Sequence, residues 1–428
     1  MPMANWRNAA SGVFQTLYSK KISPLHQTPG PDDGQYGEIM AIIWDPPLDP
    51  EASKWRDIAR RIAHEYLAPR AVALDRDQRY PYETVSLLHD CGIATMFIPT
   101  EYGGGGASLR AFCAVIEELA QACASTSGIV ATLQLGAWPL LRAGSAAQKQ
   151  TYISGLTRHR QAISFALSEQ EAGSDPSNMQ TLATPEDGGW RLRGTKRWIG
   201  GGGQCAHYLV FAQTSPGLGR RGIAAYMVAA DAQGVSSEAP EDKMGMRGTV
   251  NSSIVLDTWV PTAAMIGLPG KALKLALEAL DVGRIVVAAQ SNGIALAAFH
   301  AAAKRAAVRT AFGQALINHQ GIGFKLSDVA TRLSAGRMLA YETARHFDTG
   351  KDVALIGAQA KLFCSEAAHD AVDIGVQVFG AEGFVKPSLV ERLYRDQRAT
   401  EIYEGTSEIQ RLVIARAIHA EFNNEEQA

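Results

Sequence analysis

One carboxylate near the C-terminus lies in a setting that could support proton transfer. Glu404 stands between Tyr403 and Gly405, just before a stretch with helical apolar spacing in which Ser407 and Gln410 have the spacing of a capping box. A carboxylate in a partly apolar turn can have a raised pKa, which suits it to abstract a proton. The alternative, which these residues alone favour, is a surface glutamate that stabilises the helix dipole.

A second candidate segment covers residues 168–175, Ser-Glu-Gln-Glu-Ala-Gly-Ser-Asp, between two stretches with strand character. Its hydroxyls, backbone amides and glycine could bind the edge of a polar ligand ring. The alternative is a solvated turn, which is favoured if the segment is considered alone. A binding role therefore depends on the rest of the chain.

A third segment, residues 201–206, matches the G-x-G-x-x-A pattern of dinucleotide-binding proteins. That pattern needs a helix after the glycines, because the helix N-terminus meets the pyrophosphate. The following residues, 207–211 (His-Tyr-Leu-Val-Phe), are typical of a strand. We therefore do not expect a Rossmann site here.

The elements that position these residues fall into three parts. Apolar residues recur with helical spacing from about residue 50 to 155 and from about 270 to 420. A single helix of about 55 Å is predicted over residues 272–310. Between the helical parts, short β-type runs separated by glycine-rich turns predict a small antiparallel β domain, with strands over residues 162–167, 190–199, 207–213, 223–228 and 253–256.

This order of helices, strands and helices predicts an α+β fold with separate layers, not alternating βαβ units. Residues 1–46 are expected to form a flexible N-terminal extension, because prolines and glycines interrupt any periodicity there. An N-terminal helical domain is predicted over 47–160, a middle β domain over 161–265 and a C-terminal helical domain over 266–428.

Composition excludes several other classes of protein. The chain has 428 residues, of which 46% are hydrophobic and 20% charged, as in a soluble globular protein. Its 41 Lys and Arg nearly balance its 43 Asp and Glu, so a nucleic-acid partner is not expected. No apolar run approaches the roughly 18 residues of a membrane-spanning helix, so no membrane partner is expected either. Five scattered cysteines indicate a reducing compartment, and the histidines show no metal-ligand spacing, so no metal is expected.

Considered together, the segments resemble the acyl-CoA dehydrogenase family from about residue 50 to 420. Each motif alone is modest, but seven in the family's order are specific. They are residues 166–169 with 172–175, 194–199, 243–248 followed by 260–261, 283–284, Arg309 with 312–313, 377–380, and 403–406.

The resemblance implies a helical N-terminal domain, a central β domain and a C-terminal four-helix bundle. It also implies one FAD per subunit, with the flavin between the β domain and the C-terminal helices. Family members are usually homotetramers, or dimers of dimers, in which a neighbouring subunit binds part of each FAD.

The family reaction removes the α-hydrogen of an acyl thioester as a proton and the β-hydrogen as a hydride, which yields a trans-2-enoyl thioester. Glu404 matches the family base, and its backbone amide would form part of the oxyanion site. Some members place the base on the long helix instead, at the position of Gly283. A glycine has no carboxylate, so the resemblance places this chain with the Glu404 type.

The resemblance also carries over binding roles. The residues expected to contact the isoalloxazine are Leu167, Ser168, Trp198 and Ile199, with Gly173 and Ser174 in the adjoining loop. Those expected at the FAD pyrophosphate and adenosine of a partner subunit are Arg309, Phe312, Gln377 and Gly380; Thr406 and Glu408 also match cofactor contacts. The expected substrate contacts are Ser174, Asp281, Arg284, Tyr403 and Gly405.

Three features depart from the family pattern. Gly200 replaces a Thr or Ser whose hydroxyl would bond near flavin N5, so the redox properties of the flavin or its reactivity with oxygen could differ. Ala381 replaces a second glycine in the adenosine loop, and residues 1–46 precede the matching region.

The resemblance leaves the electron acceptor and the form of the substrate open. An electron-transfer flavoprotein is the expected acceptor, and an oxidase that uses O2 or an enzyme for carrier-protein-bound acyl groups are the alternatives. A non-catalytic flavin-binding relative is a further class, against which the retained Glu404 and the near-neutral charge both argue. A role in fatty acid or amino acid catabolism in the bacterial cytoplasm is expected, with the mitochondrial matrix as the alternative location.

Overall fold

Two of the longer N-terminal helices, α3 and α6, begin at polar side-chain caps. In the computed structural model, which describes residues 42–425, α3 (Pro50–Ile62) is capped by Asp49, whose carboxylate accepts a hydrogen bond from the Ala52 amide at 2.8 Å. α6 (Leu109–Ala122) is capped by the Ser108 hydroxyl in the same way. The remaining helices of this part are α4 (Ala71–Asp77), α5 (Tyr82–Asp90), α7 (Ala124–Ala143), α8 (Ala146–Gln148) and α9 (Ser154–His159).

The middle part is a mixed sheet, with strands in the order β6-β7-β3-β2-β4-β5-β8. β1 pairs with β4 in parallel, and β2 meets β4 in parallel at one position, whereas the other pairs are antiparallel. The strands are β1 (Ile163–Ala166), β2 (Leu182–Glu186), β3 (Gly189–Gly200), β4 (His207–Gln213), β5 (Ile223–Ala229), β6 (Val235–Ser237), β7 (Asn251–Pro261) and β8 (Met265–Ile266).

The predicted strands correspond to β1, β3, β4, β5 and β7, and a strand, not a helix, follows the glycines at 201–203. The prediction missed β2, β6 and β8. β2 contains Pro185 and is largely exposed, and β6 and β8 have only three and two residues, so none shows an apolar alternation. The parallel pairing of β1 with β4 also departs from the all-antiparallel expectation.

A β-bulge interrupts the ladder between β3 and β7. Lys196 pairs with Ile254 and Ile199 with Ser252, so two residues of β3 face one residue of β7. The second of the two, Trp198, has φ 64° and is 50% exposed, although it lies within a twelve-residue strand. The bulge therefore turns a large aromatic side chain out of the regular alternation of the strand.

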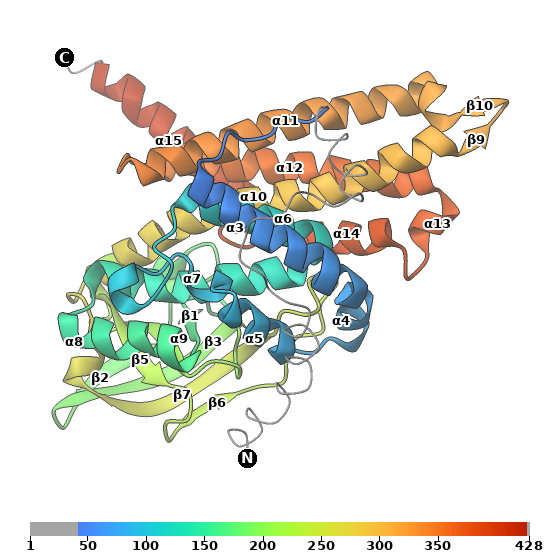
Figure 1. The fold of residues 1–428 in the computed structure, drawn as a ribbon. Helices are drawn as coiled ribbons and strands as arrows, with labels where there is room; N and C mark the ends of the chain where they lie inside the picture. The colour runs from blue at the N-terminus through green and yellow to red at the C-terminus, as the bar shows by residue number, and fades with distance from the viewer. Residues whose placement is uncertain (1–41, 426–428) are drawn as a thin grey trace. The chain divides into compact units, whose positions relative to one another are not determined.

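The C-terminal part contains three long helices that lie side by side, α10 (Ala272–Val308), α11 (Gln320–Asp348) and α12 (Ala354–Phe379). α10 confirms the predicted long helix. Every residue from 284 to 296 on α10 is buried, so α10 is the central helix of this part. α7 lies between the sheet and α10 (Figure 1). The remaining elements are β9 (Thr310–Ala311), β10 (Gln314–Ala315), α13 (Ala381–Phe384), α14 (Leu389–Gln397) and α15 (Ser407–Glu425).

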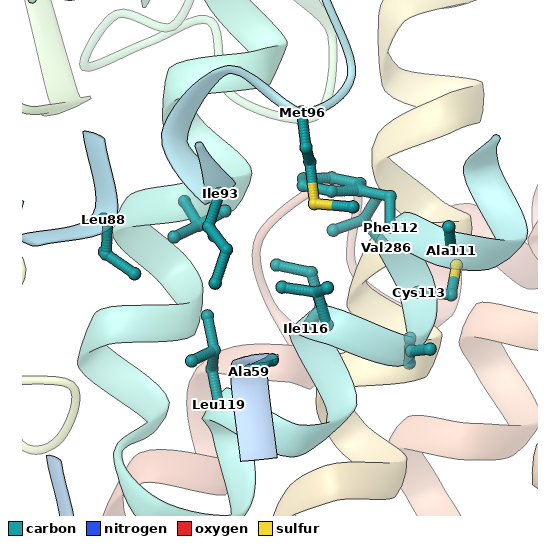
Figure 2. Close-up of a cluster of buried hydrophobic side chains, with 14 of the residues drawn as sticks. Ala59, Leu88, Ile93, Met96, Ala111, Phe112, Cys113, Ile116, Leu119 and Val286 are labelled. Carbon is teal, nitrogen blue, oxygen red and sulfur yellow. The ribbon is translucent and has the colours of Figure 1, made fainter. Parts of the chain in front are cut away.

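A large apolar core joins the N-terminal helices to α10. Figure 2 shows Met96, Phe112 and Val286 close together, with Ile116 beside them, although they come from three separate segments. All four side chains are at least 96% buried. Helices far apart in the sequence are thus fixed against each other and against α7, which contributes Ile129, Val130 and Leu133 to the same cluster.

The predicted N-terminal extension lies largely outside the described residues, but its last residues pack against α11. The Trp44 amide donates to the Ser334 hydroxyl at 3.1 Å, and Asp45 forms an ion pair with Arg337 at 3.1 Å. Residues 44–45 therefore belong to the helical body, a contact that the prolines nearby did not indicate.

Arg337 also forms a buried, bidentate pair with Glu117, which ties α11 to α6. Its Nη2 lies 2.7 Å from Glu117 Oε1 and its Nε lies 3.1 Å from Oε2. Burial raises the pKa of the Glu117 carboxyl, and the guanidinium opposes that rise. The pair provides the counter-charge that the buried Glu117 carboxylate would otherwise lack.

Among residues 42–425, no helix is long and apolar enough to span a membrane. The same part of the chain contains no group of three or more His, Cys, Asp or Glu side chains arranged to hold a metal ion.

We expect Arg337→Leu to lower the free energy of unfolding by about 3–5 kcal/mol, because it leaves Glu117 buried without a counter-charge. Denaturant unfolding of the variant and the parent measures this loss. Arg345→Leu, which removes the exposed Arg345–Glu342 pair, is the control and should cost about 0–1 kcal/mol. Equal losses in the two variants would contradict the stabilising role of the buried pair.

Candidate active site

A cavity of about 510 Å³ lies between α7, the sheet, α10 and the turn before α15. Many of the residues predicted to bind cofactor or substrate line it, and they come from four separate parts of the chain. They are Leu167, Ser168, Gly173, Ser174, Trp198, Ile199, Arg284, Tyr403, Glu404 and Gly405. The predicted site residues that do not line it are Asp281, Arg309, Phe312, Gln377, Gly380, Thr406 and Glu408.

The turn that carries Glu404 is held by side chains from two helices. Glu404 has φ 55°, an unusual conformation for a residue other than glycine. Gln410 on α15 donates from Nε2 to the carbonyl oxygens of Glu404 and Gly405, at 3.1 and 2.7 Å. Lys361 on α12 donates from Nζ to the Gly405 carbonyl at 2.8 Å. These bonds stabilise the strained turn from both sides.

The expected capping box at this helix start does not form. The Thr406 hydroxyl accepts from the Ile409 amide at 3.3 Å, and the Ser407 hydroxyl is buried without a protein partner among the described residues. Because Gln410 reaches back to the turn instead, its side chain fixes the position of Glu404.

Glu404 is half-buried, and its carboxyl oxygen Oε2 is closed to solvent and has no hydrogen-bond partner among the described residues. Burial raises the pKa of this carboxyl to about 7, although the nearby charges of Arg284 and Lys361 act in the opposite direction. The carboxyl thus changes its protonation state near neutral pH, which is the property that proton abstraction requires.

Gly283 on α10 provides the space for this carboxyl. A Cβ placed on Gly283 would lie 2.8 Å from Glu404 Cδ and Oε2, and 3.1 Å from Oε1. Any other residue at this position would have to displace the carboxyl. The two alternative family positions for a base therefore converge on one place in this chain.

Arg284 and Tyr403 are also fixed by buried partners. Arg284 pairs with Asp281 at 2.6 Å; burial raises the pKa of the Asp281 carboxyl to about 6, and Arg284 opposes that rise. The Tyr403 hydroxyl donates to Gln290 Oε1, and Gln290 in turn donates to the Ser127 hydroxyl at 2.8 Å. Asp281 itself lies behind Arg284, not at the cavity wall.

The sheet side of the cavity presents a half-exposed indole and a short polar loop. The guanidinium carbon of Arg197 lies 4.3 Å from the centre of the Trp198 ring. The loop is closed by paired backbone hydrogen bonds between Glu169 and Ala172. A Cβ on Gly173 would meet nothing within 4 Å, so the loop leaves open space at that point.

A buried Lys196–Glu169 pair holds this loop against β3. Lys196 Nζ lies 2.7 Å from Glu169 Oε1 and donates to the Leu167 carbonyl at 3.0 Å. Burial lowers the pKa of the Lys196 ammonium to about 8, and the Glu169 carboxylate opposes that effect. Glu169 also accepts from the Gln180 and Thr181 amides, so the loop is rigidly positioned.

Thr406 and Glu408 are sequence neighbours of the lining residues Gly405 and Ile409, whereas other cofactor candidates lie at helix ends away from the cavity. Arg309 follows the last residue of α10, 26 residues beyond Gly283, which corresponds to about 39 Å of helix. Phe312, in the β9–β10 turn, is 96% exposed, and Gly380 follows the end of α12. The structure therefore does not bring Arg309, Phe312 or Gly380 to the cavity of their own chain.

Sequence reasoning missed several residues around the site. Lys361 is the only Lys or Arg on α12 and lies among apolar neighbours, and that contrast could have indicated its role. Nothing in the sequence marks Thr132, although a Cβ on Gly200 would lie 3.4 Å from its hydroxyl oxygen. Other cavity-lining residues without a motif are Gln134, Trp138 and Asn251.

Comparison with known proteins identifies the family. Three family models match almost the whole described chain: the acyl-CoA dehydrogenase N-terminal domain over residues 49–160, the middle domain over 164–259 and the C-terminal domain over 270–419. The chain belongs to the acyl-CoA dehydrogenase family. It is therefore an FAD-dependent oxidoreductase, and the predicted family, α+β fold class and cofactor are confirmed.

The relatives match this chain over nearly their whole length. The mouse short-chain specific acyl-CoA dehydrogenase is 40% identical over 403 residues, 93% of this chain and 97% of its own. The probable acyl-CoA dehydrogenase FadE25 of Mycobacterium tuberculosis is 38% identical over 373 residues, 87% of this chain and 96% of its own. The butyryl-CoA dehydrogenase structure from Megasphaera elsdenii has a TM-score of 0.85 at 33% identity and covers 88% of this chain and 100% of its own.

The residues of the cavity fit the flavin ring of FAD. Trp198 offers a flat apolar surface, and Ser168 and Ser174 offer hydroxyls in a rigid loop with open space at Gly173. A planar ring with a polar edge requires this combination of groups.

Lys361→Met should raise the pKa of the Glu404 carboxyl above about 7, because it removes a buried cation that stabilises the carboxylate. Infrared difference spectra against Glu404→Gln would follow the titration of this carboxyl in each background. Lys325→Met, at an exposed position of α11, is the matched control and should leave the titration unchanged. An unaltered titration in Lys361→Met would show that the ammonium does not act on Glu404.

Proposed function

We propose that this enzyme oxidises an acyl-CoA thioester to the trans-2-enoyl-CoA, with Glu404 abstracting the α-proton. The observation that carries the proposal is the buried Glu404 carboxyl, which lines the cavity, has an unpartnered Oε2 and has a pKa of about 7. A base works best when its pKa lies near the working pH, because it is then ionised in part and still basic.

The surroundings of Glu404 suit this role. Lys361 and Gln410 hold the turn, so the carboxyl does not need to reorganise when substrate binds. The Glu404 backbone amide would donate to the thioester carbonyl, where negative charge develops as the proton leaves. An acyl chain in the cavity would exclude water from the carboxyl and favour proton transfer from carbon.

FAD, when bound, accepts the β-hydrogen as a hydride. We assign the isoalloxazine to the cavity wall near the bulge of β3 and the thioester to the space before Glu404. The residues that would hold the ring are Leu167, Ser168, Gly173, Ser174, Trp198 and Ile199. The residues that would contact the thioester and its pantetheine arm are Ser174, Arg284, Tyr403 and Gly405, and Asp281 would act through its ion pair with Arg284.

A neighbouring subunit would complete the FAD site. Arg309 and Phe312 lie at the end of α10 remote from the cavity, and Phe312 is exposed, so both are free to reach a second chain. A homotetramer, or dimer of dimers, is the proposed assembly. In this assembly, the FAD pyrophosphate and adenosine would be contacted by Arg309, Phe312, Gln377 and Gly380 of a neighbouring subunit. Thr406 and Glu408 would be further cofactor contacts.

An electron-transfer flavoprotein is the proposed electron acceptor. A chain in the structure described as the electron transferring flavoprotein of Acidaminococcus fermentans has a TM-score of 0.85 and 32% identity to this chain, and supports the proposal. Gly200 keeps the oxidase alternative open, since it leaves no side-chain hydroxyl at that position. Turnover with a dye acceptor under anaerobic conditions, together with peroxide detection in air, separates the two. A catabolic role in the cytoplasm remains our prediction.

Glu404→Gln should slow reduction of the flavin by acyl-CoA about 10²–10⁴-fold, because it keeps the shape of the side chain but removes the proton acceptor. Anaerobic stopped-flow bleaching of the flavin measures this rate. Glu366→Gln, on the outer side of α12, is the control and should react like the parent. A Glu404→Gln enzyme that bleaches as fast as the parent would refute the assignment of the base.

Moving the carboxylate to α10 is a second test of the site. Gly283→Glu alone should disturb the enzyme, because its Cβ would lie 2.8 Å from the Glu404 carboxyl. Combining it with Glu404→Gly removes that clash and should restore part of the bleaching rate, relative to Glu404→Gly alone. No recovery in the double variant, with FAD content unchanged, would show that position 283 cannot replace position 404.

A further inference from the structure

One wall of the cavity carries polar groups that the proposed reaction does not use. Gln134 and Trp138 lie four residues apart on α7, so their side chains project from the same side of the helix. Both line the cavity. Neither belongs to the turn of Glu404 nor to the loop at residues 168–175.

Each of these side chains has a buried polar atom without a protein partner among the described residues. Gln134 is 6% exposed, and its Nε2 donates to the Ala94 carbonyl at 3.0 Å. That bond fixes the orientation of the amide and leaves Oε1 as an unused, buried acceptor. The indole Nε1–H of Trp138 is an unused, buried donor. Buried polar groups are normally paired, so this acceptor and donor on one wall call for a ligand group.

The packing of α7 on α10 shows how far along the cavity Gln134 lies relative to Gly283. Gln290 donates to the Ser127 hydroxyl at 2.8 Å, whereas Ala137 and Ala276 share an apolar cluster, so the two helices run antiparallel. Gln134 lies seven residues after Ser127, and Gly283 lies seven residues before Gln290, and each span rises about 10 Å. Gln134 is therefore level with Gly283, whose Cα faces the Glu404 carboxyl.

Trp138 packs against aromatic rings, and the exposed Arg142, which does not line the cavity, places its guanidinium carbon 6.0 Å from the centre of the Trp138 ring. Trp138 stacks on Phe97 with ring centres 5.9 Å apart and an interplanar angle of 24°, and Phe97 stacks on Phe112. Within the described chain, the charged residues that line the cavity are Lys243, Arg284 and Glu404.

Two of these charged side chains already donate hydrogen bonds to protein groups, and the third is the proposed base. Lys243 donates to Asn251 Oδ1 at 2.7 Å, and Arg284 pairs with Asp281. Neither Gln134 nor Trp138 carries a charge that could neutralise an ionised acyl terminus, and burying an unpaired charge at this wall would be strongly unfavourable.

We propose that Gln134 Oε1 and Trp138 Nε1 select acyl chains that bear a neutral hydroxyl group, a choice that rests on the proposed acyl-CoA oxidation. A hydroxyl can donate to Gln134 Oε1 and accept from the Trp138 N–H at the same time. A carboxylate cannot donate and an ammonium cannot accept, so neither satisfies both atoms. A purely alkyl chain leaves Gln134 Oε1 and Trp138 Nε1 without hydrogen-bond partners. The resulting loss of binding free energy makes the enzyme prefer the hydroxyl-bearing chain.

The test uses pairs of thioesters that differ only by a terminal hydroxyl in place of a methyl group. Suitable pairs are 4-hydroxybutanoyl-CoA with pentanoyl-CoA, 5-hydroxypentanoyl-CoA with hexanoyl-CoA, and 6-hydroxyhexanoyl-CoA with heptanoyl-CoA. The FAD-loaded enzyme is mixed anaerobically with each, and the second-order rate constant of flavin bleaching is measured. In at least one pair we expect the hydroxyl member to react roughly 10- to 100-fold faster at low concentration.

Variants assign the preference to the two residues. Gln134→Leu and Trp138→Phe each remove one polar atom while keeping a bulky apolar side chain, and each should reduce the preference about tenfold or reverse it. Gln213→Leu is the matched control: Gln213 is also a buried glutamine with an unpartnered Oε1, but it does not line the cavity. It should keep the preference of the parent. If one of the cavity variants fails to fold, the other still tests the proposal.

The outcomes separate this proposal from the one on which it rests. If no thioester of either kind bleaches the flavin, the proposed function fails. If the alkyl members react as well as or better than every hydroxyl partner, the selection for a hydroxyl is overturned while acyl-CoA oxidation stands. That result would mean that water satisfies both atoms. A preference that persists in both Gln134→Leu and Trp138→Phe would overturn the assignment to these two residues.

Discussion

The contact between the Glu404 carboxyl and the Cα of Gly283 is the constraint on which the site depends. A carboxyl can lie against α10 only because position 283 has no side chain, since a Cβ there would come within 2.8 Å of it. The same closeness removes water from the carboxyl and raises its pKa to about 7. Steric fit and acidity are therefore two results of one packing arrangement. The hydrogen bonds of Lys361 and Gln410 keep the turn in the conformation that makes this contact.

The position of Gly283 depends on how α10 packs against the rest of the molecule. The buried middle section of α10 contacts the N-terminal helices on one side and α11 and α12 on another, so the position of Gly283 is set by the whole core. Phe112 and Val286 are part of that core and also line the cavity. The Arg337–Glu117 pair fixes α11 to α6 alongside α10. The packing that stabilises the fold thus also shapes the space in which the chemistry takes place.

The sequence predicted the order of layers, the long helix and the segments that meet at the cavity, because each has a strong local pattern. It did not predict the role of Gln410, which resembled a capping residue and instead holds the Glu404 turn. It also missed Gln134 and Trp138, because the residues next to them in the sequence do not indicate that these side chains line a cavity. Such roles arise from contacts between distant segments. The short strands β6 and β8 were missed because pairing, not residue pattern, defines them.

The bulge in β3 limits how this part of the chain can vary in length. Two residues, Arg197 and Trp198, face a single residue of β7. A substitution at either leaves the count unchanged and keeps the bulge. A one-residue deletion would remove the extra residue, restore regular pairing and carry the indole off the cavity wall, because strand side chains alternate between faces. Insertions and deletions are therefore more damaging here than changes of residue type, and the spacing between Lys196 and Ile199 is itself part of the binding site.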